Sequence, residues 1–166
     1  LRALESGDIE TLYRWENDTS IWKVSNTITP FSKYVLEQYI VNSHLDIYTT
    51  KQLRLVICTH KQKPIGCIDL FDFDPHHRRA GVGILIAEKS ERKKGYASEA
   101  LSILIPYTFN ALNLHQLYCN VTTDNAHCLR LFQKHKFKIS GTKKQWINNG
   151  KAWLDEHILQ LINTKL

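Results

Sequence analysis

The sequence predicts an α/β (α+β) domain with a mixed, mostly antiparallel central sheet of about seven strands and about four flanking helices. Three β-branched and apolar runs, "LRLVICT", "IGCIDLFDF" and "RAGVGILIA", follow one another across short polar turns, as in an antiparallel meander. A long helical pattern, a strand, a short helix and a hairpin come next. We therefore predict the order β-α-α-β-β-β-α-β-α-β-β in a single domain, residues 1–166.

The first part of the chain predicts a strand end followed by two helices. "LRAL" at residues 1–4 alternates as a strand does, and Asp8 is placed to cap a helix that ends near residues 17–18. An aromatic loop with Trp22 follows. Ser32 then caps a second helix, whose apolar residues recur at helical spacing.

The rest of the chain predicts the sheet and its covering helices. Strands are expected over residues 53–59, 65–73, 79–87 and 115–121, with two more joined at "NNG", residues 148–150. Apolar residues keep helical spacing for nearly five turns after Gly95. Asn125 begins a short helix. The helix after Gly95 starts where a strand ends, which is where ligands of such sheets usually bind.

Composition narrows the class of protein. No apolar run approaches the roughly 18 residues of a membrane span, and no leader opens the chain, so we expect a cytoplasmic enzyme or binding domain. The four cysteines form no C-x-x-C pair, which favours reduced, buried thiols and predicts no metal site. A net charge of +6 is compatible with nucleic acid, a phosphorylated cofactor or simple solubility. Since the chain lacks methionine and starts within a strand, we expect earlier residues to be missing.

The stretch "ERKKGYASEA" has the wrong charge for a helix start. Arg92, Lys93 and Lys94 precede the helix, although a helix N-terminus favours negative groups. A bound anion would remove this conflict, and Gly95 would let a phosphate approach the backbone amides that follow. The alternative is a solvated loop with a lysine pair. A nucleotide-triphosphate P-loop is not expected, because G-x-x-x-x-G-K-[ST] is absent.

Residues 92–97, "RKKGYA", resemble the R/Q-x-x-G-x-G/A pyrophosphate loop of the GCN5-related N-acetyltransferases (GNAT), which use acetyl-CoA. "DNAHCLRLFQKHKF", residues 124–137, is similar to a second segment of that family, N-x-x-(S/A)-x-x-(L/I)-Y-x-K-x-G-F. The predicted element order matches the family fold over essentially the whole chain. "LRALESGDIETLYRWEND", "HRRAGVGILIA" and "NLHQLY" resemble the branch with polyamine (spermidine/diamine) and ribosomal-protein N-terminal acetyltransferases.

The resemblance implies a set of cofactor contacts. Backbone amides of the loop would hold the pyrophosphate, the preceding strand end would pair with the pantetheine arm, and Asn125 would bond that arm or nearby backbone. The implied residues are Leu85, Ile86, Ala87, Arg92, Lys93, Lys94, Gly95, Tyr96, Ala97, Ser98 and Asn125. Two alternatives stay open, in which Ile86 is only a core residue and Asn125 only a helix N-cap.

The chain departs from the family pattern at two positions. Phe132 replaces the tyrosine that commonly protonates the departing thiolate, and Lys136 replaces a glycine. Because a thiol of pKa near 8.5 needs little help to gain a proton at neutral pH, water or another donor could serve. Cys128 is one candidate donor, and a buried packing thiol is its alternative.

The amine must lose a proton before it attacks the thioester, so a base or a water chain is expected. Asp69 and Asp72 are the best carboxylates, three apart on one strand and so expected on opposite faces, with a slight preference for Asp69. Either could instead be an exposed polar aspartate. The acceptor site is expected to use Trp15, Glu16, Asn17 and Trp22. Helix packing explains Trp15 equally well.

The resemblance implies direct acetyl transfer from acetyl-CoA to a primary amine, which could be a protein N-terminus, a polyamine or another small amine. The alternative is a non-catalytic acyl-CoA-binding module of the same fold, suggested by Phe132 and the net charge. Nucleic-acid binding ranks last, because no reader motif accompanies the cations. The positive charge favours a peptide or small amine over a polycation. A homo-oligomer is possible, and no membrane partner is expected.

Overall fold

The structure, a computed structural model, describes residues 1–25 and 27–164. One six-stranded sheet runs in the order β1-β2-β3-β4-β6-β5. Its strands are β1 (Leu53–Cys58), β2 (Pro64–Asp74), β3 (Arg79–Ile86), β4 (Gln116–Thr122), β5 (Lys138–Asn148) and β6 (Trp153–Ile162). The predicted mixed α+β fold is confirmed, with six strands instead of about seven. Residues 1–4 contribute only one antiparallel bridge, between Arg2 and Val56.

The α-helices are α1 (Ile9–Glu16), α2 (Thr19–Ser25), α3 (Lys33–Val41), α4 (Ile47–Thr50), α5 (Tyr96–Asn110) and α6 (Ala126–Lys134), with short 3-10 turns η1 (Ser6–Asp8), η2 (Asn42–His44) and η3 (Lys89–Glu91). Ser32 and Asn125 cap α3 and α6 as predicted, each through its side-chain oxygen. Helix α2 replaces part of the expected aromatic loop. Its start is held by Asp18, whose side chain accepts the Ser20 N–H, and Ile21 buries its apolar face.

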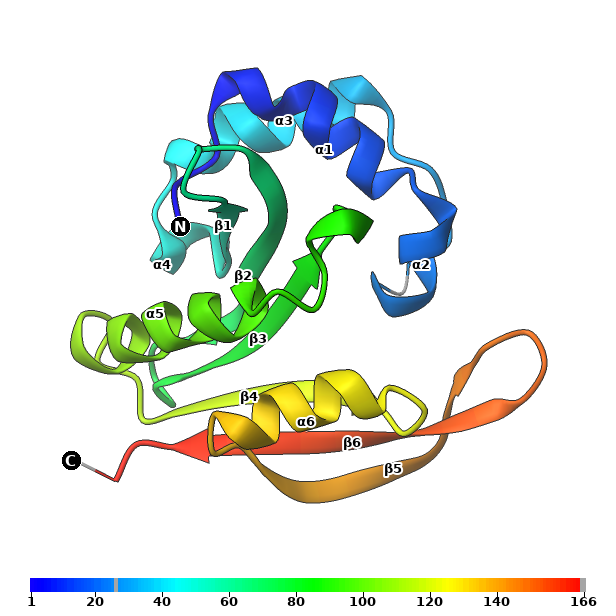
Figure 1. Cartoon of the computed structure of the whole chain (residues 1–166). Coiled ribbons are helices and arrows are strands. Elements are labelled where there is room, and N and C mark those ends of the chain that lie inside the picture. Colours follow the sequence, from blue (N-terminus) through cyan, green and yellow to red (C-terminus); the bar gives the residue numbers. More distant parts are fainter. Residues whose placement is uncertain (26, 165–166) are drawn as a thin grey trace.

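Helices cover both faces of the sheet (Figure 1). On one face, α5 and α6 pack on strand residues such as Ile68, Leu70 and Leu117. On the other, α1 and α3 pack against Val56 and Cys67 of the β1–β2 half. Since side chains alternate along a strand, Cys67, Asp69 and Phe71 of β2 and the even-numbered β4 residues lie on this second face. None of the helices in the described ranges is long and apolar enough to cross a membrane.

Strands β3 and β4 run parallel but separate early (Figure 1). Only Arg79, Ala80 and Gly81 of β3 pair with β4, and the last of these pairs joins Gly81 to Tyr118. From Val82 onward β3 pairs only with β2, and from Cys119 onward β4 pairs only with β6. Because a lone strand edge leaves N–H and C=O groups unpaired, the divergence forms an opening in the sheet that a ligand can enter as an extended segment.

Both departures from the family pattern lie at the end of α6. Lys136 has φ 69°, and its N–H donates to the Gln133 carbonyl while Phe137 N–H donates to the Phe132 carbonyl. This is a Schellman motif, which places a left-handed residue just past the helix. The matching hydrophobic contact is an edge-to-face pair of Phe132 and Phe137, with centroids 5.0 Å apart. Phe132 is therefore a buried packing residue at the helix end.

Replacing Lys136 by glycine is expected to stabilise the protein. A non-glycine residue in the left-handed region costs about 1–2 kcal/mol, part of which glycine gives back as entropy of the unfolded chain. We expect a net gain of about 0.5–1 kcal/mol in the free energy of unfolding, measured by urea denaturation. Lys138→Gly is the control, because Lys138 lies in ordinary strand backbone, where glycine should destabilise. Equal effects of both variants would contradict the prediction.

Candidate active site

A turn with two left-handed residues precedes α5. Lys93 has φ 62° and Gly95 has φ 93°, and no side chain caps the helix that begins at Tyr96. The first N–H groups of an α-helix have no intrahelical acceptor, so those of Tyr96, Ala97 and Ser98 point out of the helix start. A Cβ at Gly95 would meet no atom within 4 Å. The loop therefore offers an open, electropositive anion site of the kind that the sequence predicts.

Two of the loop cations have internal partners. The Arg92 guanidinium donates to the Ile86 carbonyl at 2.8 Å and to the Ala87 carbonyl at 3.3 Å, and Lys94 Nζ contacts Glu91 at 2.9 Å. Arg92 thus lies against the end of β3, where the pantetheine arm was expected. The Ala87 N–H donates to the Ile65 carbonyl, so the strand end from Leu85 is partly satisfied without a ligand.

Ser98 is linked to α6 through a histidine that the sequence reading did not single out. Its hydroxyl lies 2.8 Å from Nε2 of His135, the C-cap of α6. Burial, and then the charge of Lys134, lower the pKa of His135 below its usual value. The imidazole is therefore neutral at pH 7 and can fix the orientation of the Ser98 hydroxyl.

Asn125 and Cys128 lie where β4 runs into α6. The Asn125 side-chain oxygen accepts the Cys128 N–H at 3.1 Å, so the N-cap role is present. Burial raises the pKa of the Cys128 thiol to about 11, which keeps the proton on sulfur at neutral pH. Cys128 can therefore donate an S–H hydrogen bond.

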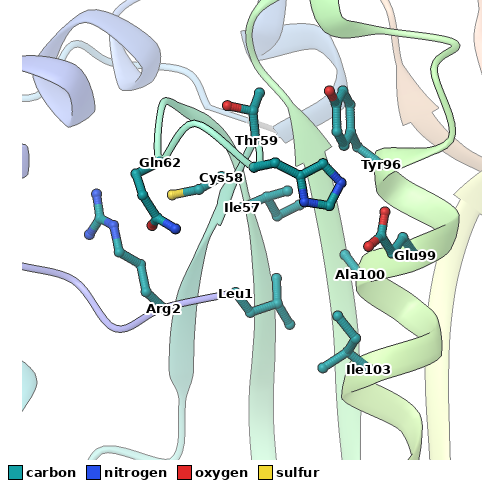
Figure 2. Close-up of a pocket in the computed structure, with 11 residues that line it drawn as sticks. Leu1, Arg2, Ile57, Cys58, Thr59, Gln62, Tyr96, Glu99, Ala100 and Ile103 are labelled. Atoms are coloured by element: carbon teal, nitrogen blue, oxygen red, sulfur yellow. The ribbon is translucent and has the colours of Figure 1, made fainter.

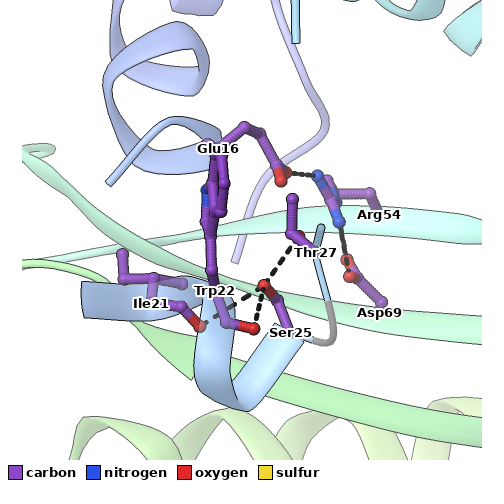
Figure 3. A network of polar contacts seen from close by, with 7 residues as sticks. All are labelled: Glu16, Ile21, Trp22, Ser25, Thr27, Arg54 and Asp69. Atoms are coloured by element: carbon purple, nitrogen blue, oxygen red, sulfur yellow. Dashed lines mark hydrogen bonds and ion pairs between the residues drawn. The ribbon is translucent and has the colours of Figure 1, made fainter. Parts of the chain in front are cut away.

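An ionic cluster joins α1 to the sheet (Figure 3). Arg54 of β1 binds both oxygens of Asp69 at 2.8–2.9 Å and one oxygen of Glu16 at 2.5 Å. All three side chains keep between 21% and 28% of their surface exposed, so the cluster is part-buried. Asp69 pairs across the strands with Gly83, in the open part of β3. The Asp69 carboxylate therefore sits beside the opening, with both oxygens engaged.

Asp72 lies at the closed end of the opening. Its carboxylate accepts the Tyr118 hydroxyl at 3.0 Å, and the ring of Tyr118 packs edge to face on Phe71. Burial and then Asp72 raise the pKa of Tyr118 to about 12. Asp72 has φ 48° within an irregularity of β2, which breaks the alternation of side chains. The expectation that Asp69 and Asp72 point to opposite faces is wrong for this reason, since Asp72 reaches the face of Phe71.

The expected acceptor residues divide into two pairs. Trp15 is buried and donates to Glu88 at 2.9 Å, and Asn17 exchanges two hydrogen bonds with the backbone of Phe31. The Glu16 side chain instead joins Asp69 through Arg54 (Figure 3), and the Trp22 indole donates to the Glu16 backbone carbonyl at 2.7 Å. The structure thus connects Glu16 with Asp69, ties Trp22 to Glu16, and places Trp15 and Asn17 in helix packing.

A hollow of about 720 Å³ lies between the α2 region and the β5–β6 hairpin, at the end of β4. It is lined by Trp22, Lys23, Val24, Thr27, Ile28, Thr122, Asp124, Asn125, Trp146, Ile147, Asn148, Asn149 and Leu154. The hairpin residues were missed at the sequence level, where "NNG" marked only a turn. The available sequence signal was a pair of tryptophans on either side of that turn, Trp146 and Trp153, which the structure leaves more than half exposed.

A smaller hollow of about 230 Å³ lies between the β1–β2 turn and α5, with Arg2, Cys58 and Ile103 on its walls (Figure 2). Among the predicted cofactor residues, Tyr96 alone lines it. The better candidate for the active site is therefore the opening between β3 and β4. The loop of residues 92–97 that we predict to bind phosphate, called the phosphate loop below, lies at its end, and the larger hollow lies beside it.

Comparison with known proteins identifies the family of this chain. Residues 1–138 match the family model of the acetyltransferase (GNAT) domain. The chain belongs to the GNAT family.

Relatives of known activity support the enzyme class. The chain is 28% identical to spermidine N(1)-acetyltransferase of Vibrio cholerae over 141 residues, covering 85% of this chain and 79% of the relative. It is 31% identical to YnaD of Bacillus subtilis, an uncharacterized N-acetyltransferase, covering 98% and 92%. The crystal structure of the Vibrio cholerae spermidine enzyme with CoA and spermine superimposes with a TM-score of 0.88 at 25% identity, covering 99% and 95%. This GNAT protein is an acetyl-CoA-dependent N-acetyltransferase, and the non-catalytic alternative has no support.

Proposed function

We propose that this GNAT enzyme transfers the acetyl group directly to a primary amine at the point where β3 and β4 separate. The observation that supports this proposal most directly is that only three residue pairs join β3 to β4. The phosphate loop lies at the open end of this short ladder, and the Glu16–Arg54–Asp69 cluster lies alongside. A thioester in the opening would be accessible to an amine from the α1–α2 side. Gly83 is opposite Asp69 and has no side chain to cover the strand there.

The cofactor contacts that we propose follow the predicted set. Backbone amides of residues 92–97, with the Ser98 hydroxyl, hold the pyrophosphate, and the edge of residues 85–87 pairs with the pantetheine arm. Arg92 competes for this edge, because it already binds the Ile86 carbonyl. We propose that Arg92 turns to the pyrophosphate when the cofactor binds. Asn125 can offer its amide nitrogen, since its oxygen caps α6.

The chemical step forms a C–N bond and breaks the C–S bond. The neutral amine attacks the acetyl carbonyl carbon, and the nitrogen of the resulting adduct loses a proton. The adduct then breaks its C–S bond and releases the CoA thiolate, which takes up a proton. Asp69 has both oxygens bound by Arg54, so we propose Asp72 as the proton acceptor, through water. Cys128 is less acidic than a free CoA thiol, so it serves as a hydrogen-bond donor to sulfur and solvent supplies the proton.

The test is an acceptor screen that measures CoA release with acetyl-CoA present. Spermidine, N-terminal peptides and aminoglycosides are compared in parallel, because the relatives of known activity act on spermidine. CoA release with any amine, together with mass gain of that amine by one acetyl group, supports the proposal. Saturable acetyl-CoA binding without turnover on the whole panel would contradict it.

We expect a pH dependence of acetyl-CoA binding that requires His135. In the free protein the pKa of His135 is lowered, and a pyrophosphate beside Ser98 should raise it. A pKa that rises on binding means proton uptake, so affinity should increase as the pH falls from about 7.5 to about 6. By isothermal titration calorimetry, we expect the acetyl-CoA affinity of the parent to rise about threefold more over this pH range than the affinity of His135→Asn does. The variant serves as the reference because the cofactor's own phosphate, which titrates near pH 6, affects both proteins equally. Identical pH profiles would contradict the prediction.

Self-association and a cytoplasmic location stay predictions. Size-exclusion chromatography with light scattering on the full chain tests the first.

A further inference from the structure

We propose that the acceptor is the α-amine of a polypeptide whose first residues are uncharged and apolar, and that polyamines are poor acceptors for this enzyme. This inference rests on the proposed function and concerns the hollow between α2 and the β5–β6 hairpin. Its basis is the charge pairing around that hollow, the character of its lining and the state of the nearest carboxylates.

The lining combines apolar side chains, two of them tryptophans, with polar ones. Trp22 is fixed by its bond to the Glu16 carbonyl, and Trp146 of β5 lies on the hairpin side with 56% of its surface exposed. Ile28, Val24 and Leu154 add aliphatic surface. Its volume of about 720 Å³ lies in the range of pockets that hold drug-sized ligands, so two or three residues of an extended peptide fit. Asn148 and Asn149 lie at the hairpin end with their side-chain oxygens accepting N–H groups of the turn, so their amide nitrogens are the groups that can donate to a peptide carbonyl.

The charged residues that line the hollow are Lys23 and Asp124, and they lie 3.7 Å apart as an ion pair. The described lining therefore has no net charge. A neutral lining offers no free carboxylate to the distal ammonium groups of a polyamine, which would have to compete with Lys23 for Asp124.

The nearest carboxylates also favour an amine of low pKa. Both oxygens of Asp69 are bound by Arg54, and Asp72, the proposed proton acceptor, already accepts the Tyr118 hydroxyl and acts only through water. At pH 7 about one in ten α-amines of pKa near 8 is neutral, against about one in 2500 alkyl amines of pKa near 10.4. A site that assists deprotonation only through water therefore favours the α-amine.

The experiment compares kcat/KM for three acceptors on the full chain: the peptide amide Ala-Leu-Phe, the same peptide with Lys in third place and its α-amine acetylated, and spermidine. We expect the first to exceed the other two at least tenfold. Butylamine and 1,4-diaminobutane form a second pair that differs only by the distal charge, and we expect the diamine to be the poorer acceptor.

Lys23→Glu tests the charge of the lining directly, because Lys23 is exposed and is the cation among the described lining residues. It should raise kcat/KM for spermidine relative to the peptide about tenfold. Lys61→Glu is the control, since it makes the same charge change in the β1–β2 turn and should leave the ratio unchanged.

Spermidine equal to or better than the peptide would overturn the inference, and so would an unchanged ratio in Lys23→Glu. Failure of every amine, with acetyl-CoA still bound, would instead overturn the proposed function. Circular dichroism and the Tm confirm that both lysine variants are folded.

Discussion

Replacing Gly95 by glutamate is expected to weaken acetyl-CoA binding and lower kcat/KM at least about 100-fold. Gly95 has φ 93°, and its Cβ position is free of protein atoms, so the loss comes from backbone conformation and from the added carboxylate. A side chain there projects into the site proposed for the pyrophosphate, and its negative charge opposes the phosphates. Calorimetry with acetyl-CoA gives the affinity, and CoA release gives kcat/KM.

Gly150→Glu is the matched control. Gly150, in the β5–β6 turn, has φ 84° and likewise no atom near its Cβ position. The variant introduces the same strain and charge away from the phosphate loop, so acetyl-CoA affinity should stay unchanged. If Gly95→Glu bound acetyl-CoA like the parent, the anion site would have to lie elsewhere.

Arg54→Met should destabilise the protein by about 2–3 kcal/mol and reduce kcat/KM at least tenfold. Removing one member of a buried ionic cluster leaves uncompensated charge, a change that costs about 3–5 kcal/mol when burial is complete. The partial exposure of Asp69 and Glu16 reduces this figure. The catalytic loss follows because Arg54 ties α1 to the strand beside the opening. Urea denaturation and acceptor kinetics measure the two effects.

Arg14→Met is the comparison for Arg54. Arg14 makes one bond, to Glu88, from a side chain that is 63% exposed, so its loss should cost below about 1 kcal/mol. Arg54→Lys should recover only part of the stability, because an ammonium cannot reproduce the bidentate contact. Comparable losses in Arg14→Met and Arg54→Met would show that the cluster has no special role.

Local chemistry in the sequence was sufficient for most of the fold. Alternation and turn residues predicted β1, β2 and β3 to within one residue at each end, and the caps Ser32 and Asn125 fix their helices as expected. These features depend on neighbours within a few positions. The prediction of a strand at residues 1–4 was wrong, because these alternating residues form only the single bridge between Arg2 and Val56.

The site was less predictable, since it joins distant segments. Arg54 meets Asp69 and Glu16 across 15 and 38 residues, and the pattern of any one segment does not reveal such a pairing. Asp72 changed faces because β2 carries an irregularity with a left-handed residue, which no proline or glycine marks in the sequence. The β5–β6 hairpin enters the site only through tertiary packing.

The short ladder between β3 and β4 also has a consequence for exchange with solvent. Three residue pairs couple two halves of one sheet, so amide protons on the open edge of β3, from Val82 to Ile86, lack the shielding that a neighbouring strand gives. Deuterium should enter this edge sooner than it enters β2, which is flanked on both sides. An extended cofactor arm in the gap would slow that uptake and raise the melting temperature with ligand concentration, because only the native sheet can bind it. Cofactor occupancy would thereby decide whether the two halves behave as one cooperative unit.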